Sequence, residues 1–234
     1  KNLNTLEEYG FDEVKPREAL LACGDFGTGA LAEVTDILEK VSNTLNEKNK
    51  SNQIATIAIF FAVMIVINIL SSIIFNILPV PIKPTIVHIP VIIASIIYGP
   101  RVGACLGALM GLMSMTHNTI ILLPTSYLFS PFVENGNVYS IIIAVVPRIL
   151  IGITPYFVYK WIKNRKGLFI AGAVGSMTNT IFVLGGIFFL FSSVFDGNIQ
   201  AMLATVLGTN SIAEMIISSV LTAALVPTLQ KIQK

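Results

Sequence analysis

The sequence predicts an all-α integral membrane protein, a bundle of six transmembrane helices with both termini in the cytoplasm. Two observations support this prediction. Hydrophobic residues make up 54% of the 234-residue chain and charged residues only 12%, whereas a soluble domain has about 25% charged residues. Ten of the thirteen acidic residues lie before residue 51. The chain is therefore expected to consist of a polar segment, residues 1–50, and a membrane domain, residues 51–234.

Six apolar stretches can form the predicted membrane helices. A spanning helix needs about 20 mainly apolar residues. Five of the stretches meet this length, and the second is short and follows a proline-rich segment, 79–84. The predicted spans are residues 54–78, 86–98, 102–121, 138–159, 168–194 and 201–229.

Basic residues in the short loops predict the orientation, because cytoplasmic loops are enriched in Lys and Arg. With six spans, nine basic residues of the loops and ends fall on one side of the membrane and only Lys83 on the other. Five or seven spans would mix these two groups. The sequence thus predicts a multi-pass protein of the cell membrane with both termini cytoplasmic.

The polar segment, residues 1–50, is expected to be a cytoplasmic extension with one amphipathic helix. Apolar residues recur at helical spacing from Leu31 to Leu45, with charged residues between them, and this helix is expected to end near Asn46. The glycine-rich stretch 24–30 (GDFGTGA) is not expected to bind phosphate, because no strand is predicted before it.

Polar side chains inside the apolar spans are the candidate ligand-binding residues. Such groups are costly in a membrane and usually face the interior of the helix bundle or a cavity. Because successive spans run in opposite directions, most of these residues fall in the outer half of the membrane, with Asn179 at mid-depth. This distribution predicts an outward-facing polar pocket for a small hydrophilic ligand. The candidates are His88, Asn118, Arg148, Asn179, Asn210 and Glu214.

Structural roles are an open alternative for these residues. Arg148 and Glu214 can form a buried ion pair that holds two helices together. Asn179 can form an interhelical hydrogen bond, which contributes only about 0.6–2 kcal/mol in membrane proteins.

Two patterns of small residues predict close contacts between helices. Gly103, Gly107 and Gly111 form a ladder on one face of the third span, for which packing within the protein is the favoured interpretation. Ala58 and Ala62 form a pair near the cytoplasmic start of the first span. This pair can serve either internal packing or contact with a partner protein.

The sequence lacks the motifs of several other classes of protein. It contains no His-Glu-x-x-His, Gly-x-Ser-x-Gly or Walker motif. Its basic residues are scattered and form no nucleic-acid-binding patch. Its two cysteines, Cys23 and Cys105, lack the spacing of metal ligands. We therefore predict no enzymatic activity, no metal site, no cofactor and no nucleic-acid partner.

Several motifs follow one another in a recognisable order. The stretch 87–111 (VHIPVIIASIIYGPRVGACLGALMG) combines a short helix, a Gly-Pro turn and a glycine-rich helix. The runs 179–185 (NTIFVLG) and 210–214 (NSIAE) lie in the fifth and sixth spans. Together with Ala58-x-x-x-Ala62, these motifs resemble the substrate-binding S component of an energy-coupling factor (ECF) vitamin transporter, over residues 51–234.

The resemblance implies a non-enzymatic membrane subunit that binds a vitamin with high affinity. Its partners would be the membrane lipid, a transmembrane coupling subunit and two ATP-binding-cassette ATPases. The resemblance also implies that Ala58 and Ala62 contact the coupling subunit, and that the segment 79–84 covers the vitamin pocket. Asn179, Asn210 and Glu214 would line that pocket.

The expected vitamin is pantothenate, because residues 88–114 and 126–132 (SYLFSPF) resemble the pantothenate-type branch of the family. The expected pocket lacks Trp, which disfavours flat-ring ligands such as folate or thiamine. Glu214 would repel the carboxylate of pantothenate unless Arg148 compensates its charge. Hydroxymethylpyrimidine, riboflavin or folate binding, a stand-alone secondary carrier, and a membrane scaffold with a functional polar segment are the alternatives.

Overall fold

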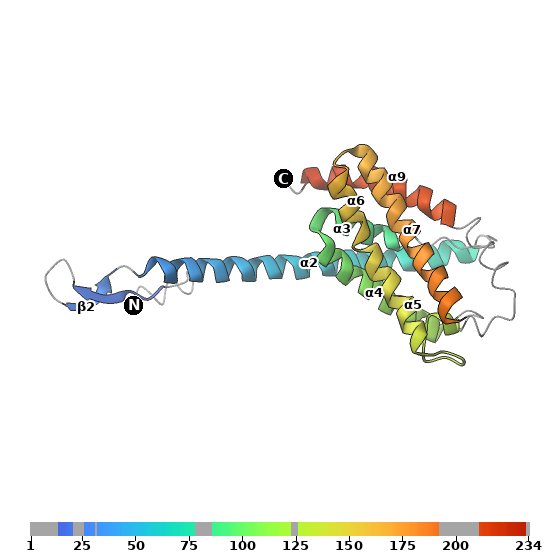
Figure 1. Ribbon diagram of the computed structural model, residues 1–234, viewed down its shortest axis with the longest axis horizontal. Coiled ribbons are helices and arrows are strands. Elements are labelled where there is room, and N and C mark those ends of the chain that lie inside the picture. The colour runs from blue at the N-terminus through green and yellow to red at the C-terminus, as the bar shows by residue number, and fades with distance from the viewer. Residues whose placement is uncertain are drawn as a thin grey trace. The chain divides into compact units, whose positions relative to one another are not determined.

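The computed structural model describes residues 14–20, 26–30, 32–77, 86–122, 126–191 and 211–232. The chain divides into two compact units, Lys1–Ala55 and Thr56–Lys234. Figure 1 shows the ribbon of the chain, with most of its helices labelled.

The first unit contains a β-hairpin that the sequence does not predict. Strand β1 (Arg17–Leu20) pairs antiparallel with strand β2 (Phe26–Ala30). The glycine-rich stretch 24–30 therefore follows a strand, and the expectation that no strand precedes it is wrong. Glycine and alanine are depleted in strands, so the residues of β2 do not predict a strand. The strand forms because it pairs with β1, in spite of its low intrinsic propensity.

Helix α2 (Val34–Ile77) is a single continuous helix. The expectation that the amphipathic helix ends near Asn46, before a separate first span, is wrong. Helices usually end at Gly or Pro, and the connecting stretch 46–54 (NEKNKSNQI) contains neither. Its polar residues lower helix propensity by less than about 0.7 kcal/mol each relative to alanine, so the helix continues into the apolar stretch.

The second unit is a bundle of helices. Four segments are long and apolar enough to cross a membrane, namely Lys50–Ile74, Val138–Trp161, Arg165–Leu190 and Ile212–Lys231. These helices confirm an all-α membrane protein. The elements of the bundle that follow α2 are α3 (His88–Tyr98), α4 (Pro100–Ile120), the 3-10 helix η1 (Ser126–Leu128), α5 (Val138–Ile151), α6 (Thr154–Trp161), α7 (Arg165–Leu190) and α9 (Ile212–Ile232).

The predicted second and third spans correspond to α3 and α4, which are not among the four long apolar segments. Helix α3 has 11 residues and is too short. The polar side chains of His117 and Asn118 lower the hydropathy of α4. Residues 192–194 of the predicted fifth span and 201–210 of the sixth lie outside the described residues.

The predicted fourth span is bent. Helix α5 ends at Ile151, and α6 begins at Thr154 with Pro155 in its first turn. Proline has no backbone N–H and cannot continue the hydrogen bonds of a preceding helix, whereas it is well tolerated in a first turn. Pro155 therefore separates the two helices within one apolar segment.

Helix α3 lies at the centre of the bundle. Its residues from His88 to Ile96 are all buried, and it contacts α4, α5, α6, α7 and α9. Val91, Ile92 and Leu106 belong to the core that these helices share. Because protein rather than lipid covers α3, this helix need not be long enough to span the membrane alone.

The glycine ladder of α4 packs against α5. A Cβ atom at Gly107 would clash with the carbonyl oxygen of Arg148, and one at Gly111 would lie 2.7 Å from the carbonyl oxygen of Ala144. Gly103 makes a similar contact with Gly152. The predicted packing within the protein is confirmed, and the ladder brings the backbone of α4 directly against the α5 segment that carries Arg148.

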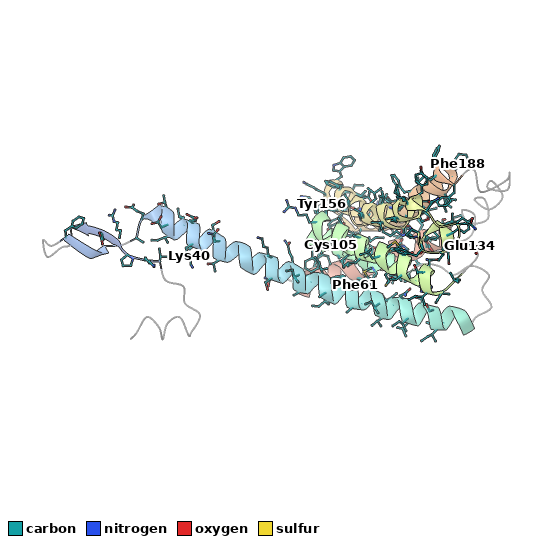
Figure 2. All side chains as sticks on the ribbon, turned by 90° about the horizontal axis from the view of Figure 1, so that it is seen from below. Lys40, Phe61, Cys105, Glu134, Tyr156 and Phe188 are labelled. Atoms are coloured by element: carbon teal, nitrogen blue, oxygen red, sulfur yellow. The ribbon has the colours of Figure 1, made fainter. Side chains whose placement is uncertain are left out.

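Three consecutive segments of the bundle, α4, α5–α6 and α7, alternate in direction. Figure 2 shows Cys105 and Tyr156 at one end of this unit, and Glu134 and Phe188 at the opposite end. Cys105 lies near the start of α4, and Phe188 lies near the end of α7. The end of α4, the start of α5 and the end of α7 therefore lie at the same end of the bundle, as the predicted alternation requires.

Candidate functional site

Arg148 is a buried cation near the middle of the bent segment formed by α5 and α6. It is 8% exposed, and its Cζ atom lies 5.2 Å from the centre of the Phe129 ring, within the range of a cation–π interaction. Its Nε atom has no hydrogen-bond partner among the described residues. A guanidinium group with an unused donor is suited to bind a carboxylate.

The proline before Arg148 explains part of this geometry. Pro147 lies inside α5 and has no N–H to donate to the carbonyl oxygen of Ile143, four residues earlier. Arg148 Nη1 donates a hydrogen bond to this same oxygen, at 2.7 Å. The side chain of Arg148 thus satisfies a helix carbonyl with one donor, and other donors remain for a second partner.

Glu214 supplies the opposite charge. It lies in the first turn of α9 and is 6% exposed. Its carboxylate attracts the charge of the Arg148 guanidinium. The two ionisable residues that the sequence places inside the spans therefore interact within the bundle, and each lowers the cost of burying the other.

Asn179 presents an unused acceptor. Its Oδ1 atom is buried and has no hydrogen-bond partner among the described residues, and the same is true of Ser176 Oγ. The two residues are three apart on α7 and share one face of the helix. A buried polar atom without a partner costs about 1–3 kcal/mol. A polar ligand or a water molecule that bonded to both atoms would remove this cost.

His88 and Asn118 occupy different positions in the bundle. His88 is 1% exposed at the start of α3. Asn118, near the end of α4, donates a hydrogen bond from Nδ2 to the carbonyl oxygen of Ser114 and accepts one from Ser126 Oγ, at 2.8 and 3.3 Å. The side chain of Asn118 therefore connects α4 to the loop that carries Phe129.

The loop from Ser126 to Ser130 is held at both ends. Thr119 Oγ1 and Ser130 Oγ are 2.7 Å apart, and Ser140 Oγ donates to the carbonyl oxygen of Tyr127 at 2.6 Å. These bonds position the Phe129 ring beside Arg148. In the sequence, this loop is notable only for its resemblance to the pantothenate-type branch of the family. Neither Phe129 nor Ser176 is predicted from the sequence as a site residue.

Tyr127, in the same loop, packs against the end of α7. Its ring centre lies 5.9 Å from that of Phe191, and both belong to a small apolar cluster with Ile143 and Ile187. Burial raises the pKa of the Tyr127 phenol.

Ala58 and Ala62 lie on the outer face of α2. Both are exposed, whereas Met64 is fully buried against the core. At 100° per residue, the two alanines lie on the side of the helix opposite to Met64. They are therefore available to another protein or to lipid, and they do not pack within the second unit.

Asn210 and the segment 79–84 lie outside the described residues. Within the described parts of the chain, no group of three His, Cys, Asp or Glu residues could hold a metal ion.

Two comparisons identify relatives of this chain. Residues 52–226 match the family model described as "ECF transporter, substrate-specific component". The chain is 45% identical over 190 residues to the Pantothenic acid transporter PanT of Lactococcus lactis subsp. cremoris, which covers 79% of this chain and 97% of that protein. It is 28% identical over 162 residues to the Pantothenate transporter PanT of Leuconostoc mesenteroides, covering 61% of this chain and 73% of that protein.

A third similarity is short. Over 44 residues, the chain is 41% identical to the Probable phosphopantothenoylcysteine decarboxylase of Streptococcus mutans, which corresponds to 19% of this chain and 25% of that protein. The transporter relatives, in contrast, match most of their own length. Because the family model covers most of the membrane domain, the chain belongs to the substrate-specific components of ECF transporters, which are membrane transport subunits and not enzymes.

Proposed function

We propose that this chain is the high-affinity pantothenate-binding subunit of an ECF-type vitamin transporter in the cell membrane. The observation that supports this function best is the 45% identity to the PanT of L. lactis, which extends over 97% of that protein. A second PanT, from L. mesenteroides, is also similar over most of its length.

The polar groups inside the bundle suit this ligand. Pantothenate has a carboxylate, two hydroxyl groups and an amide. Arg148 has an unused donor for the carboxylate, and Asn179 has an unused acceptor for a hydroxyl or amide N–H. Glu214, with its charge offset by Arg148, can accept a hydrogen bond from a ligand hydroxyl. His88, Asn118 and Asn210 complete the proposed binding set.

The proposed topology has six spans with both termini cytoplasmic. The turn between α6 and α7 supports this orientation, because Lys160, Lys163, Arg165 and Lys166 are all exposed there and basic loops are retained on the cytoplasmic side. Trp161, at the end of α6, is 88% exposed, as expected for an aromatic residue at the membrane interface. In this orientation, the proposed pocket would open at the other, external end of the bundle.

Identification of the bound vitamin tests the function. The protein purified in detergent is expected to retain pantothenate, which mass spectrometry of the denatured sample would detect. Cells that also produce the coupling subunit and the two ATPases are expected to take up labelled pantothenate. The chain alone in liposomes under an ion gradient is expected to give no uptake. A different retained vitamin, or uptake by the chain alone, would contradict the proposal.

The proposed partner surface is the outer face of α2. Replacing both Ala58 and Ala62 with Phe is expected to reduce pantothenate uptake at least tenfold, because two bulky rings would prevent close approach of the coupling subunit. The dissociation constant of purified protein for pantothenate should not change, since neither residue packs against the core. Ile74→Phe is the control, because Ile74 is also exposed on α2 but lies away from the alanine pair. Equal uptake by both variants would contradict this surface.

We propose a separate origin for the polar segment. The transporter family match begins at residue 52, and the 190-residue match to the PanT of L. lactis leaves about a fifth of the chain uncovered. The decarboxylase similarity spans 19% of the chain and fits this remainder in length. The 44 matching residues are thus assigned to the polar segment, as one quarter of a decarboxylase-type fold.

A further inference from the structure

The described side chains of the first unit are mostly exposed. Among its described side chains, Ala32 is the one buried apolar residue. Phe26 on β2 is 74% exposed, and Leu38 and Val41 on α2 are 62% and 49% exposed. A two-stranded hairpin is at best marginally stable in water, and very small domains usually need additional support. The described residues of the unit therefore contribute little buried apolar surface to its stability.

The exposed apolar residues are presented on defined elements. Leu38 and Val41 are three residues apart and lie on one face of α2. Arg17, at the start of β1, forms an ion pair with Glu33, directly before α2. Both side chains are about half exposed, so this pair adds little stability, but it connects the hairpin to the start of the helix. Phe26, Leu38 and Val41 are hereafter called the apolar set.

We infer that the apolar set is a docking surface for the remaining three quarters of a phosphopantothenoylcysteine decarboxylase-type subunit. This inference rests on the proposed assignment of the polar segment to that fold. If the 44 matching residues form one quarter of such a subunit, their apolar side chains are the ones that the other three quarters would cover. The docked subunit would be held at the pantothenate-binding protein.

The test uses the full chain in detergent and two forms of the S. mutans decarboxylase. One form is complete, and the other lacks the 44 residues that match this chain. Co-expressed with the full chain, the shortened enzyme is expected to be soluble and to copurify with it. The complete enzyme carries its own copy of the segment and should bind at least tenfold more weakly.

Variants of α2 make the test specific. Leu38→Lys combined with Val41→Lys is expected to reduce copurification of the shortened enzyme at least tenfold. Asn43→Lys is the control, because Asn43 is exposed on the opposite side of the same helix and the substitution adds one of the two positive charges of the double variant. Pantothenate binding should be unchanged in all three proteins, which separates this inference from the proposed transport function.

Three results would overturn the inference. In the first, the shortened enzyme does not copurify with the wild-type chain. In the second, it copurifies with the double variant as well as with the wild-type chain. In the third, the chain does not bind the enzyme but changes its own oligomeric state. A second measurement does not depend on the shortened enzyme folding alone. In a chimera, residues 1–50 of this chain replace the matching segment of the decarboxylase, and decarboxylation should be retained. An insoluble or inactive chimera would also overturn the inference.

Discussion

Replacing Arg148 with Gln is expected to weaken pantothenate binding about a hundredfold or more. The guanidinium group is buried and has an unused donor at Nε. Removing one partner of a buried, hydrogen-bonded charge pair costs about 2–5 kcal/mol. Gln is chosen because its amide can still donate a hydrogen bond, so that the carbonyl oxygen of Ile143 need not lose its partner. Titration of ligand-free protein with pantothenate would measure the change in dissociation constant.

The control for this prediction is Arg101→Gln. Arg101 lies at the exposed start of α4, so its loss removes the same charge from the protein without touching the site. Pantothenate binding by the Arg101 variant should be unchanged. If both variants bind pantothenate as tightly as the wild-type protein, Arg148 does not contact the ligand.

A double variant separates ligand binding from ion pairing. If Arg148 only offsets the charge of Glu214, then removing both charges in Arg148→Gln with Glu214→Gln should restore binding to near the wild-type affinity. If Arg148 binds the ligand carboxylate, the double variant should bind as weakly as the single Arg148 variant or more weakly. The second outcome is expected, because the attraction between the two residues leaves Nε without a partner.

The membrane helices could be predicted because their signal is strong. A run of about 20 apolar residues has few other stable structures, so the spans at α2, α5–α6 and α7 were located to within a few residues. The local details were less predictable. Nothing in the stretch 46–54 ends a helix, and α2 therefore continues through it. The β-hairpin depends on pairing between two segments whose own propensities are weak.

The charged members of the candidate site gave the strongest signal in the sequence. Arg148 and Glu214 stand out because an ionisable group inside an apolar span is costly, and both are buried in the bundle. Phe129 and Ser176 gave no such signal, since aromatic rings and hydroxyl groups are common in membrane helices and loops. Whether Phe129 and Ser176 lie at the site depends on how the loop 126–130 packs on α5 and on which face of α7 lies inside the bundle. The Pro147–Arg148 dipeptide could have predicted the hydrogen bond of Arg148 to the helix backbone, because each proline in a helix leaves one carbonyl oxygen unpaired.

Replacing Gly107 with Ala is expected to destabilise the protein by about 1–3 kcal/mol, the usual cost of inserting an extra carbon into a packed core. The added Cβ atom would clash with the carbonyl group of Arg148 and lie 3.0 Å from the Cα atom of Ile149. These are backbone atoms of α5, which cannot rotate away as a flexible side chain can. For a chain of this size, the loss corresponds to a decrease in Tm of about 2–12 °C.

Gly185→Ala is the matched control for this prediction. No atom of the described residues lies within 4 Å of the position that its Cβ would take, and Ala forms helix better than Gly by about 1 kcal/mol. The Tm of this variant should stay the same or rise slightly. The Gly107 variant should also bind pantothenate more weakly, because separating α4 from α5 moves the backbone of Arg148. A Gly107 variant with unchanged Tm and unchanged affinity would show that the α4–α5 contact does not position the ligand-binding cation.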